Sequence, residues 1–197
     1  MYITVGIAAT DIDGNITKEN DYGELIPIMK DIDNQDDEMV DYYYLRSVMV
    51  DCLTQFDAVI GVIGSNTYEQ MKNMDLVKSL DSVIVSDKET INLKTKVLAE
   101  IYNLESQMIT EMLENGQKIR SKKYSNICVL VLGGETVYEK FFEEYDVFHH
   151  LQYNEPIKGG KKSITMLIDG LQKKLYIKRE GMKINNFKIK TYHKDYE

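Results

Sequence analysis

Residues 127–139 read ICVLVLGGETVYE, and residues 57–69, DAVIGVIGSNTYE, are built in the same way. Each is an apolar run followed by glycine, a small polar turn containing threonine, and a Tyr-Glu pair that opens a helical pattern. Such runs, rich in β-branched residues and bounded by glycine, are typical of strands buried on both faces of a parallel sheet. Glycine at the turn lets a ligand approach the backbone, and the first N–H groups of the helix suit a phosphate. Two such units in one sheet would hold both ends of a dinucleotide.

The composition is that of a globular protein with one full-sized core, since the chain has 197 residues of which 43% are hydrophobic. A net charge of −8 argues against nucleic acid as a partner, because binding to a phosphate backbone needs a basic surface. The apolar runs are too short to span a membrane, and the N-terminal residues do not resemble a signal peptide. We therefore expect a cytoplasmic protein, monomeric or homodimeric, without a membrane partner. The cysteines, Cys52 and Cys128, are expected to be reduced core residues.

Strand and helix patterns alternate along most of the chain. Strands are expected at 2–9 and 82–86, and two further strands are expected to end at 63 and at 132. Helices are expected at 36–56 and 104–113, and two further helices are expected to start near 68 and 137. Late strands are expected at 147–153, 174–179 and 187–193, with turns at Gly159-Gly160 and Glu180-Gly181. The stretch 17–37 is interpreted as a polar, acidic loop insertion. The pattern predicts an α/β fold of one domain over 1–197, with a mixed, mostly parallel central sheet flanked by helices and antiparallel C-terminal edge strands.

Four segments, in this order, resemble the dihydrofolate reductase superfamily, which includes the reductase domain of riboflavin biosynthesis. They are AATDIDGNI at 8–16, IGSNTY at 63–68, IVSD at 84–87 and LGGETVY at 132–138. The resemblance implies a dihydrofolate reductase-like fold. It also implies an NAD(P)H-dependent reductase of a pterin or related pyrimidine-type small molecule, with NADPH as the cofactor and NADH as a possible substitute.

The resemblance also implies which residues contact the cofactor. They are Ala9, Ile16, Gly64, Ser65, Asn66, Thr67, Val85, Ser86, Gly133, Gly134, Glu135 and Thr136. The same residues have a simpler reading, in which the glycines only form strand-to-helix turns and Thr67 and Thr136 cap the helices.

The chain departs from the family pattern in its charges. Ser65 stands where the family has a basic residue, and Asp87 and Glu135 place acids where phosphates are expected, with Lys88 as a neighbouring cation. The chain also has no Trp beside the nicotinamide position. These departures keep a second hypothesis open: a reductase-like scaffold without catalysis that binds a protein or nucleotide partner.

The resemblance assigns Asp41 as the catalytic acid, and Ala8, Asp41 and Leu45 as substrate-binding residues. Helical spacing places Asp41 in line with Leu45, Val48 and Cys52, which would draw its carboxyl toward the apolar stripe and raise its pKa. The alternative is that Asp41 lies in an exposed first turn and complements the helix dipole. Asp21 and Glu24 are weaker candidates for the acid.

Other polar and aromatic residues give less definite signals. His149 and His150 are adjacent and would face opposite ways on a strand, so no metal site is expected. The tyrosines at 42, 43 and 44 would either stack on a flat substrate ring or pack the helix.

Overall fold

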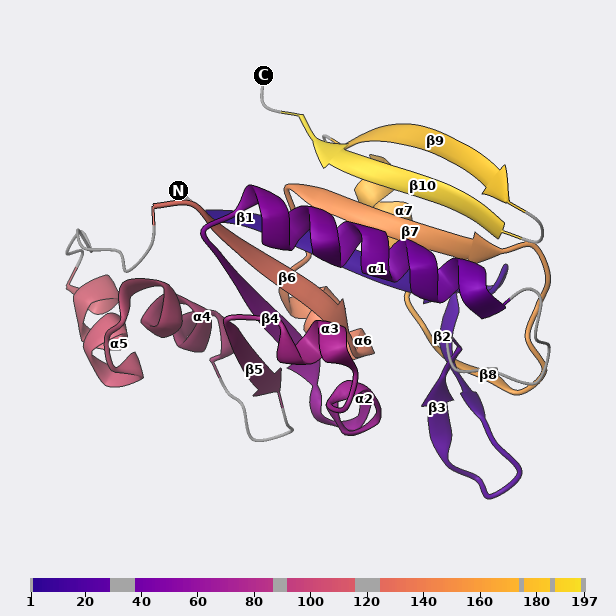
Figure 1. Ribbon diagram of the computed structural model, residues 1–197, viewed down its shortest axis with the longest axis horizontal. Helices are drawn as coiled ribbons and strands as arrows, with labels where there is room; N and C mark the ends of the chain where they lie inside the picture. The colour runs from indigo at the N-terminus through magenta and orange to yellow at the C-terminus, as the bar shows by residue number, and fades with distance from the viewer. Residues whose placement is uncertain are drawn as a thin grey trace.

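The computed structural model describes residues 2–28, 38–86, 92–115, 125–173, 176–184 and 187–195. Its main strands are β1 (Tyr2–Thr10), β4 (Ala58–Gly64), β5 (Ser82–Ser86), β6 (Ile127–Gly133), β7 (Val147–Tyr153), β9 (Tyr176–Ile184) and β10 (Phe187–Lys194). They form a seven-stranded sheet in the order β5-β4-β6-β1-β7-β10-β9 (Figure 1). Neighbours from β5 to β7 are parallel, and β10 is antiparallel to both β7 and β9. The predicted fold class is confirmed.

Helices lie on both faces of this sheet (Figure 1). They are α1 (Glu38–Gln55), α2 (Ser65–Met71), α3 (Asp75–Lys78), α4 (Leu93–Tyr102), α5 (Ser106–Glu114), α6 (Glu135–Lys140) and α7 (Thr165–Lys173). The α1 face is covered by α1 and α3, while α4, α6 and α7 cover the opposite face, here called the α4 face. The expected stripe of α1 is confirmed, since Leu45, Val48 and Cys52 are buried against the sheet.

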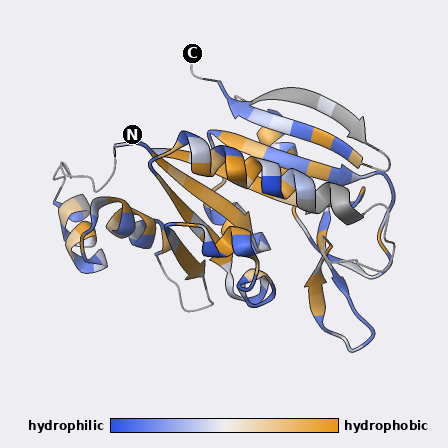
Figure 2. Ribbon diagram, in the orientation of Figure 1, coloured by the Kyte–Doolittle hydropathy of each residue, from blue (hydrophilic) through white to orange (hydrophobic). Residues whose placement is uncertain are grey.

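The continuous apolar runs of the central strands follow from this double cover. In β6, Cys128, Leu130 and Leu132 pack on the α1 face, whereas alternate residues of the same strand pack on the α4 face. Both sets are buried, so no polar position interrupts the strand, and the middle of the sheet is uniformly hydrophobic (Figure 2). Cys52 and Cys128 are free and buried, as expected.

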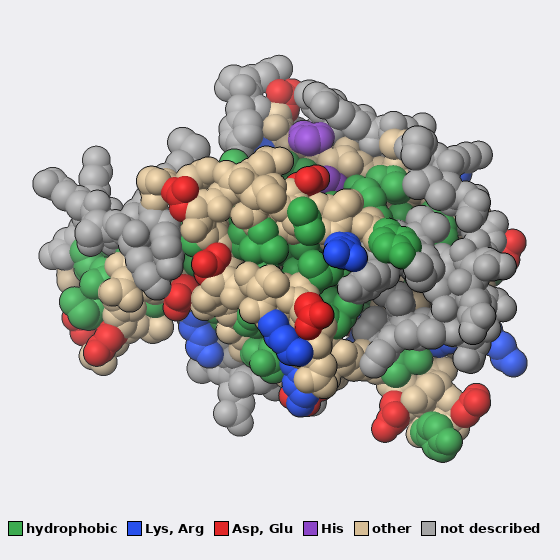
Figure 3. Space-filling model, viewed as in Figure 1, with side chains coloured by type: hydrophobic (Ala, Val, Ile, Leu, Met, Phe, Trp, Pro, Cys, Tyr) green, Lys and Arg blue, Asp and Glu red, His purple; other side chains and the backbone are tan. Residues whose placement is uncertain are grey.

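A second, antiparallel sheet has the order β3-β2-β8 and is formed by β3 (Leu25–Pro27), β2 (Asn15–Glu19) and β8 (Gly160–Ser163). The interpretation of 17–37 as a loop is therefore wrong for its first part, which is a hairpin, and residues 29–37 lie outside the described part. The turn is held by the Asn20 side chain, whose Oδ1 accepts from the backbone N–H groups of Tyr22 and Glu24 at 3.0 and 2.9 Å. Tyr22 is 90% exposed at this tip, where a hydrophobic side chain projects between acidic ones (Figure 3).

The turn predicted at Glu180-Gly181 is also wrong, because both residues lie within β9. The pairing of β9 with β10 shifts register between Lys188 and Lys190, and a Cβ at Gly181 would lie 3.2 Å from the carbonyl oxygen of Ile189. Glycine here accommodates a close approach of two backbones at an irregularity in the strand pair, rather than a chain reversal.

Three helices, α3, α4 and α7, were not expected from the sequence, and the helix predicted from Leu104 begins at Ser106. The start of α4 is capped by Asn92, whose Oδ1 accepts from the N–H of Thr95 at 3.0 Å. Its end is set by Asn103, which adopts a left-handed conformation with φ 52°. No helix among the described residues is long and apolar enough to cross a membrane.

Gly6 and Gly61 differ in how closely buried side chains approach them, so we expect alanine substitutions at the two positions to have different effects on stability. A Cβ at Gly6 of β1 would lie 2.4 Å from Cδ2 of Phe148 and 2.6 Å from Cε1 of Tyr145, both fully buried rings. A Cβ at Gly61 of β4 would meet only the end of the Leu80 side chain within 3 Å. We expect Gly6→Ala to lower the free energy of unfolding by about 1–3 kcal/mol in urea denaturation, with a smaller loss for Gly61→Ala. Equal losses would contradict this account of the packing.

Candidate functional site

The two strand-to-helix turns noted in the sequence lie side by side at the C-terminal edge of the sheet. We call residues 64–67 the first glycine corner and residues 133–136 the second. Strands β4 and β6 are adjacent and parallel, with Ile63 paired to Gly133. A Cβ at Gly64 would lie 3.4 Å from the carbonyl oxygen of Gly133 and 3.5 Å from Cα of Gly134. The two backbones therefore meet where neither carries a side chain.

The conformation of the second corner requires glycine, since φ is 156° at Gly133 and 92° at Gly134. Thr67 of α2 covers this backbone, because a Cβ at Gly133 would lie 3.0 Å from Cγ2 of Thr67. The alternative in which Thr67 and Thr136 cap their helices is wrong. The N-cap residues are Gly64 and Gly134, and neither helix has a side-chain cap. The first N–H groups of both helices are therefore not taken by a capping side chain.

The remaining corner residues border solvent to different degrees. Asn66 and Thr136 are exposed, whereas Ser65 and Glu135 are partly exposed. Ser86 ends β5 directly beside the first corner, since it pairs with Gly64, and it is buried. Val85 packs on the α1 face. Asp87 and Lys88 lie outside the described residues.

Strands β1 and β6 separate beside the second corner. Their pairing runs from Tyr2 and Ile127 to Gly6 and Val131, and it then stops. Strand β1 continues to Thr10 along β7 alone, while β6 continues to Gly133 along β4. We call the separated ends, residues 7–10 and 132–134, the β1–β6 fork. In open parallel sheets, ligands bind beyond the carboxyl ends of strands at such a point.

Tyr138 of α6 closes the base of the fork. Its hydroxyl donates a hydrogen bond of 2.7 Å to the carbonyl oxygen of Ile7, the first β1 residue beyond the pairing. Tyr138 is buried, and burial raises the pKa of its hydroxyl, which keeps the proton available for donation. Sequence reasoning did not assign Tyr138 to the site. Its only signal was the aromatic position after the second corner.

The predicted residues of β1 lie on different faces of the sheet. Ala9 packs beside Leu151 on the side where Tyr44 of α1 contacts the cluster. Ala8 packs on the α4 face, in one cluster with Ile16 of β2 and Val137 of α6. Leu45 is buried on the α1 face. The structure thus buries Ala8 and Ile16 in the cluster that contains Val137 of α6, and Ala9 in the cluster that Tyr44 contacts, but it does not bring the side chains of Ala8 and Leu45 together.

Asp11, at the end of β1, anchors the small sheet to the fork. The residue is fully buried, and its carboxylate accepts hydrogen bonds from the backbone N–H groups of Asp13, Asn15 and Ile157 at 3.0, 2.8 and 3.1 Å. The Asn15 amide adds a fourth bond at 2.9 Å. Because every donor is local or backbone, Asp11 fixes the turn into β2 rather than serving as a reacting acid.

A cation from the small sheet reaches the second corner. Nζ of Lys162 in β8 lies 3.4 Å from Oε2 of Glu135, the first residue of α6. Both side chains remain accessible, with exposed fractions of 51% and 32%. The acid that the sequence places at the second corner is therefore paired with a lysine distant in sequence.

Asp41 lies in α1, but its side chain is outside the described part, so its role as the acid stays a prediction.

One turn after Asp41, the Tyr44 hydroxyl is 2.9 Å from Nδ1 of His149 on β7, and Thr191 Oγ1 is 3.5 Å from the same nitrogen. Burial, and secondarily the charge of His193, lowers the pKa of His149 to about 4. His149 is therefore neutral at pH 7 and can accept from Tyr44. Of the three tyrosines, Tyr44 packs the helix, whereas Tyr43 is exposed.

His150 turns to the other face of β7, as expected for adjacent strand residues. It is buried, and its Nε2 is 2.8 Å from Oγ1 of Thr10. Among the residues that the structure describes, no group of histidine, cysteine or acidic side chains is arranged to hold a metal ion.

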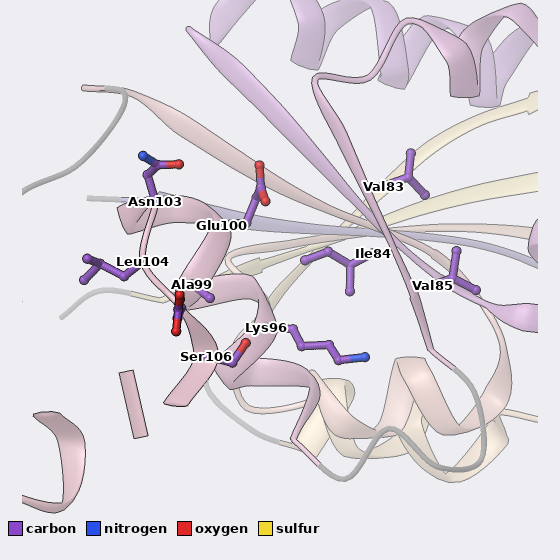
Figure 4. Close-up of a pocket in the computed structure, with 10 residues that line it drawn as sticks. Val83, Ile84, Val85, Lys96, Ala99, Glu100, Asn103, Leu104 and Ser106 are labelled. Carbon is purple, nitrogen blue, oxygen red and sulfur yellow. The ribbon is translucent and has the colours of Figure 1, made fainter. Parts of the chain in front are cut away.

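A surface pocket of about 610 Å³ lies away from the corners, at the outer edge of the sheet (Figure 4). It is bordered by Val83, Ile84 and Val85 of β5 and by Lys96, Ala99, Glu100, Asn103, Leu104, Glu105 and Ser106 in and after α4. Of the predicted site residues only Val85 belongs to it. Its polar groups are surface side chains, whereas at the glycine corners Gly64 and Gly134 are partly exposed and Gly133 is buried beneath Thr67.

Comparison with solved structures shows the fold. A dihydrofolate reductase from Enterococcus faecalis, complexed with NADP(H) and RAB-propyl, matches with a TM-score of 0.53 and 17% sequence identity, covering 98% of this chain and 97% of that one. A protein assigned to riboflavin biosynthesis from Shewanella sp. PV-4 matches with a TM-score of 0.47 and 14% identity, covering 98% and 99%. No protein-family model and no curated protein sequence matches the chain. The protein has a dihydrofolate reductase-like fold.

The neutral His149 predicts a loss of stability in acid. An unfolded chain binds this proton near the ordinary pKa of 6.5, whereas the folded protein binds it only near about 4. Protons therefore favour the unfolded state as the pH falls through this window, and stability is lost. His149→Gln keeps an acceptor for Tyr44 but cannot titrate. We expect its free energy of unfolding to fall less between pH 7 and pH 4.5 than that of the wild type, by roughly 1–2 kcal/mol. Parallel loss in both proteins, measured by urea denaturation, would contradict the prediction.

Proposed function

We propose that this protein is an NAD(P)H-dependent reductase that transfers a hydride to a pterin or a related pyrimidine-type ring. One observation carries the proposal: the two glycine corners meet on adjacent strands, directly beside the fork between β1 and β6. The dihydrofolate reductase-like fold supports it, since a dihydrofolate reductase of that fold is complexed with NADP(H). The free, buried thiols of Cys52 and Cys128 are compatible with the reducing cytoplasm, where we place the enzyme.

The residues at the corners fit a nicotinamide dinucleotide. Gly64 and Gly134 are partly exposed and carry no Cβ, which suits the approach of a pyrophosphate to the backbone, and the Thr67 hydroxyl lies 3.4 Å from where a Cβ of Gly133 would be. Ser86, beside Gly64, would contact the adenosine ribose. Ala9, on β1 at the fork, and Ile16, on β2, would border the nicotinamide ring. When bound, a reduced nicotinamide supplies the hydride.

The protein must also supply a proton to the reduced ring. We assign this role to Asp41, because it lies in α1 one turn before Tyr44, which packs against the cluster that contains Ala9 of the fork. A carboxyl acid near the reacting ring would hold the proton and deliver it directly or through an ordered water. Tyr138 would keep the Ile7 end of the fork in place through its hydrogen bond.

A second function is favoured by the charges at the corners. Ser65 offers no cation beside Gly64, and Glu135 follows Gly134 with a carboxylate. A scaffold that has lost catalysis and binds a protein or a nucleotide would keep the fold and tolerate these changes. Nucleotide binding and turnover separate the two candidates.

Thermal melting with NADPH, with NADH and without nucleotide tests cofactor binding. A nucleotide present at a hundred times its dissociation constant stabilises the folded protein by roughly 2.7 kcal/mol, which gives a clear rise in Tm. We expect such a rise with at least one of the two. Unchanged melting with both would reject the reductase and leave the scaffold, and AMP at the same concentration controls for binding of adenosine alone.

The role of Asp41 predicts a separation of binding from turnover. Asp41→Asn removes the acid while keeping the size of the side chain, so we expect turnover to fall by about 10²–10⁴-fold with NAD(P)H binding nearly intact. Turnover is followed at the nicotinamide absorbance band, with dihydrofolate and then with a pyrimidine intermediate of riboflavin synthesis as the substrate. Asp51→Asn, at an exposed position of the same helix, is the control. Wild-type turnover by the Asp41 variant, or equal loss of binding and turnover, would remove Asp41 from this role.

A further inference from the structure

The ion pair between Lys162 and Glu135 brings a positive charge to the second glycine corner. Lys162 Nζ and Glu135 Oε2 are 3.4 Å apart, and Glu135 directly follows Gly134. About half of the Lys162 side chain remains exposed, so its ammonium can exchange one oxygen partner for another without unburying a core residue.

The position of Lys162 is set by the small sheet. Its neighbour Lys161 pairs with Thr17 of β2, and its Nζ lies 4.0 Å from Oε2 of Glu19. Lys162 itself adopts a left-handed conformation with φ 57°. The next residues are fixed to the turn after β1, since Ser163 Oγ is 2.7 Å from Thr165 Oγ1, which donates to the carbonyl of Asp13 at 3.0 Å. Adjacent lysines of one strand thus have different surroundings.

Glu135 carries a negative charge at the place where the proposed site would bind a phosphate. A carboxylate one residue beyond Gly134 would repel a phosphate that approaches the glycine backbone. Among the ion pairs of the described residues, Lys162 is the cation placed on this carboxylate, so the corner presents a neutral pair instead of a bare acid. Ser65, at the first corner, brings no charge that would share this task.

We propose that Lys162 binds the pyrophosphate of the nicotinamide cofactor, and that Glu135 competes with the pyrophosphate for its ammonium. The inference rests on the proposed function and names the cation of that site. It makes two predictions of opposite sign: loss of Lys162 weakens nucleotide binding, and loss of the Glu135 charge strengthens it. Because the pyrophosphate is common to both nucleotides, NADPH and NADH are affected to the same extent.

The test compares Lys162→Met, Glu135→Gln and the control Lys161→Met with the wild type, using titrations of NADPH and of NADH. We expect Lys162→Met to raise both dissociation constants by about tenfold, the loss of one charge-assisted contact. Glu135→Gln should lower both constants, and Lys161→Met should leave them unchanged. Raising the salt concentration should weaken binding less in Lys162→Met than in the wild type, because screening acts on the contact that has been removed.

Each other outcome counts against the assignment. Wild-type affinity in Lys162→Met, or an effect on NADPH alone, would overturn it while leaving the proposed function standing. Weaker binding in both Lys162→Met and Glu135→Gln would show that the pair only holds β8 against α6, and would overturn it as well. A wild type that binds neither nucleotide would reject the proposed function itself, and the role of Lys162 with it.

Discussion

The approach of two backbones at Gly64 and Gly133-Gly134 is the contact on which the rest of the site depends. A Cβ on Gly64 would lie in van der Waals contact with the carbonyl oxygen of Gly133, at 3.4 Å, and a side chain at Gly133 or Gly134 would be strained by the positive φ of 156° and 92°. The missing side chains leave Gly64 and Gly134 partly exposed at the ends of two neighbouring strands, while Gly133 is buried beneath Thr67. The short helices α2 and α6 both start from this point without a side-chain cap.

The fork between β1 and β6 extends this arrangement. Where β1 and β6 separate, beside the second corner, β1 remains paired with β7 and β6 remains paired with β4. Tyr138 satisfies the carbonyl of Ile7 at the point of separation. On the other side of the opening, Asp11 ties the small sheet to the end of β1 with four hydrogen bonds. Lys162 reaches the second corner from this same small sheet.

Local sequence signals predicted the parts of the fold that are determined locally. The runs ending at Gly64 and Gly133 are buried on both faces, and that burial requires the continuous apolar sequence that was read as parallel strands. The glycine corners followed from the same pattern. By contrast, the sequence around Gly181 predicts a turn, because a glycine within a strand pair and a glycine in a chain reversal cannot be told apart until the partner strand is known. The hairpin is not evident in the sequence because β2 and the turn are polar and β3 has three residues.

The side chains missed at the site depend on contacts between distant parts of the chain. Tyr138 meets Ile7 across 131 positions, and Lys162 meets Glu135 through the pairing of β8 with β2. The sequence around residues 161 and 162 does not distinguish the two lysines, which contact different acids only in the folded chain. Residue spacing could therefore predict the two glycine corners, but not the side chains of Tyr138 and Lys162 that lie beside them.

Hydrogen–deuterium exchange with and without NADPH tests the central claim most directly. If the glycine corners and the fork form the nucleotide site, bound NADPH slows exchange at residues 63–68 and 132–138 and at the end of β1. The pocket at the edge of β5, bordered by residues 83–85 and 96–106, is then unaffected. Slower exchange confined to that pocket, or no change anywhere, would contradict the account.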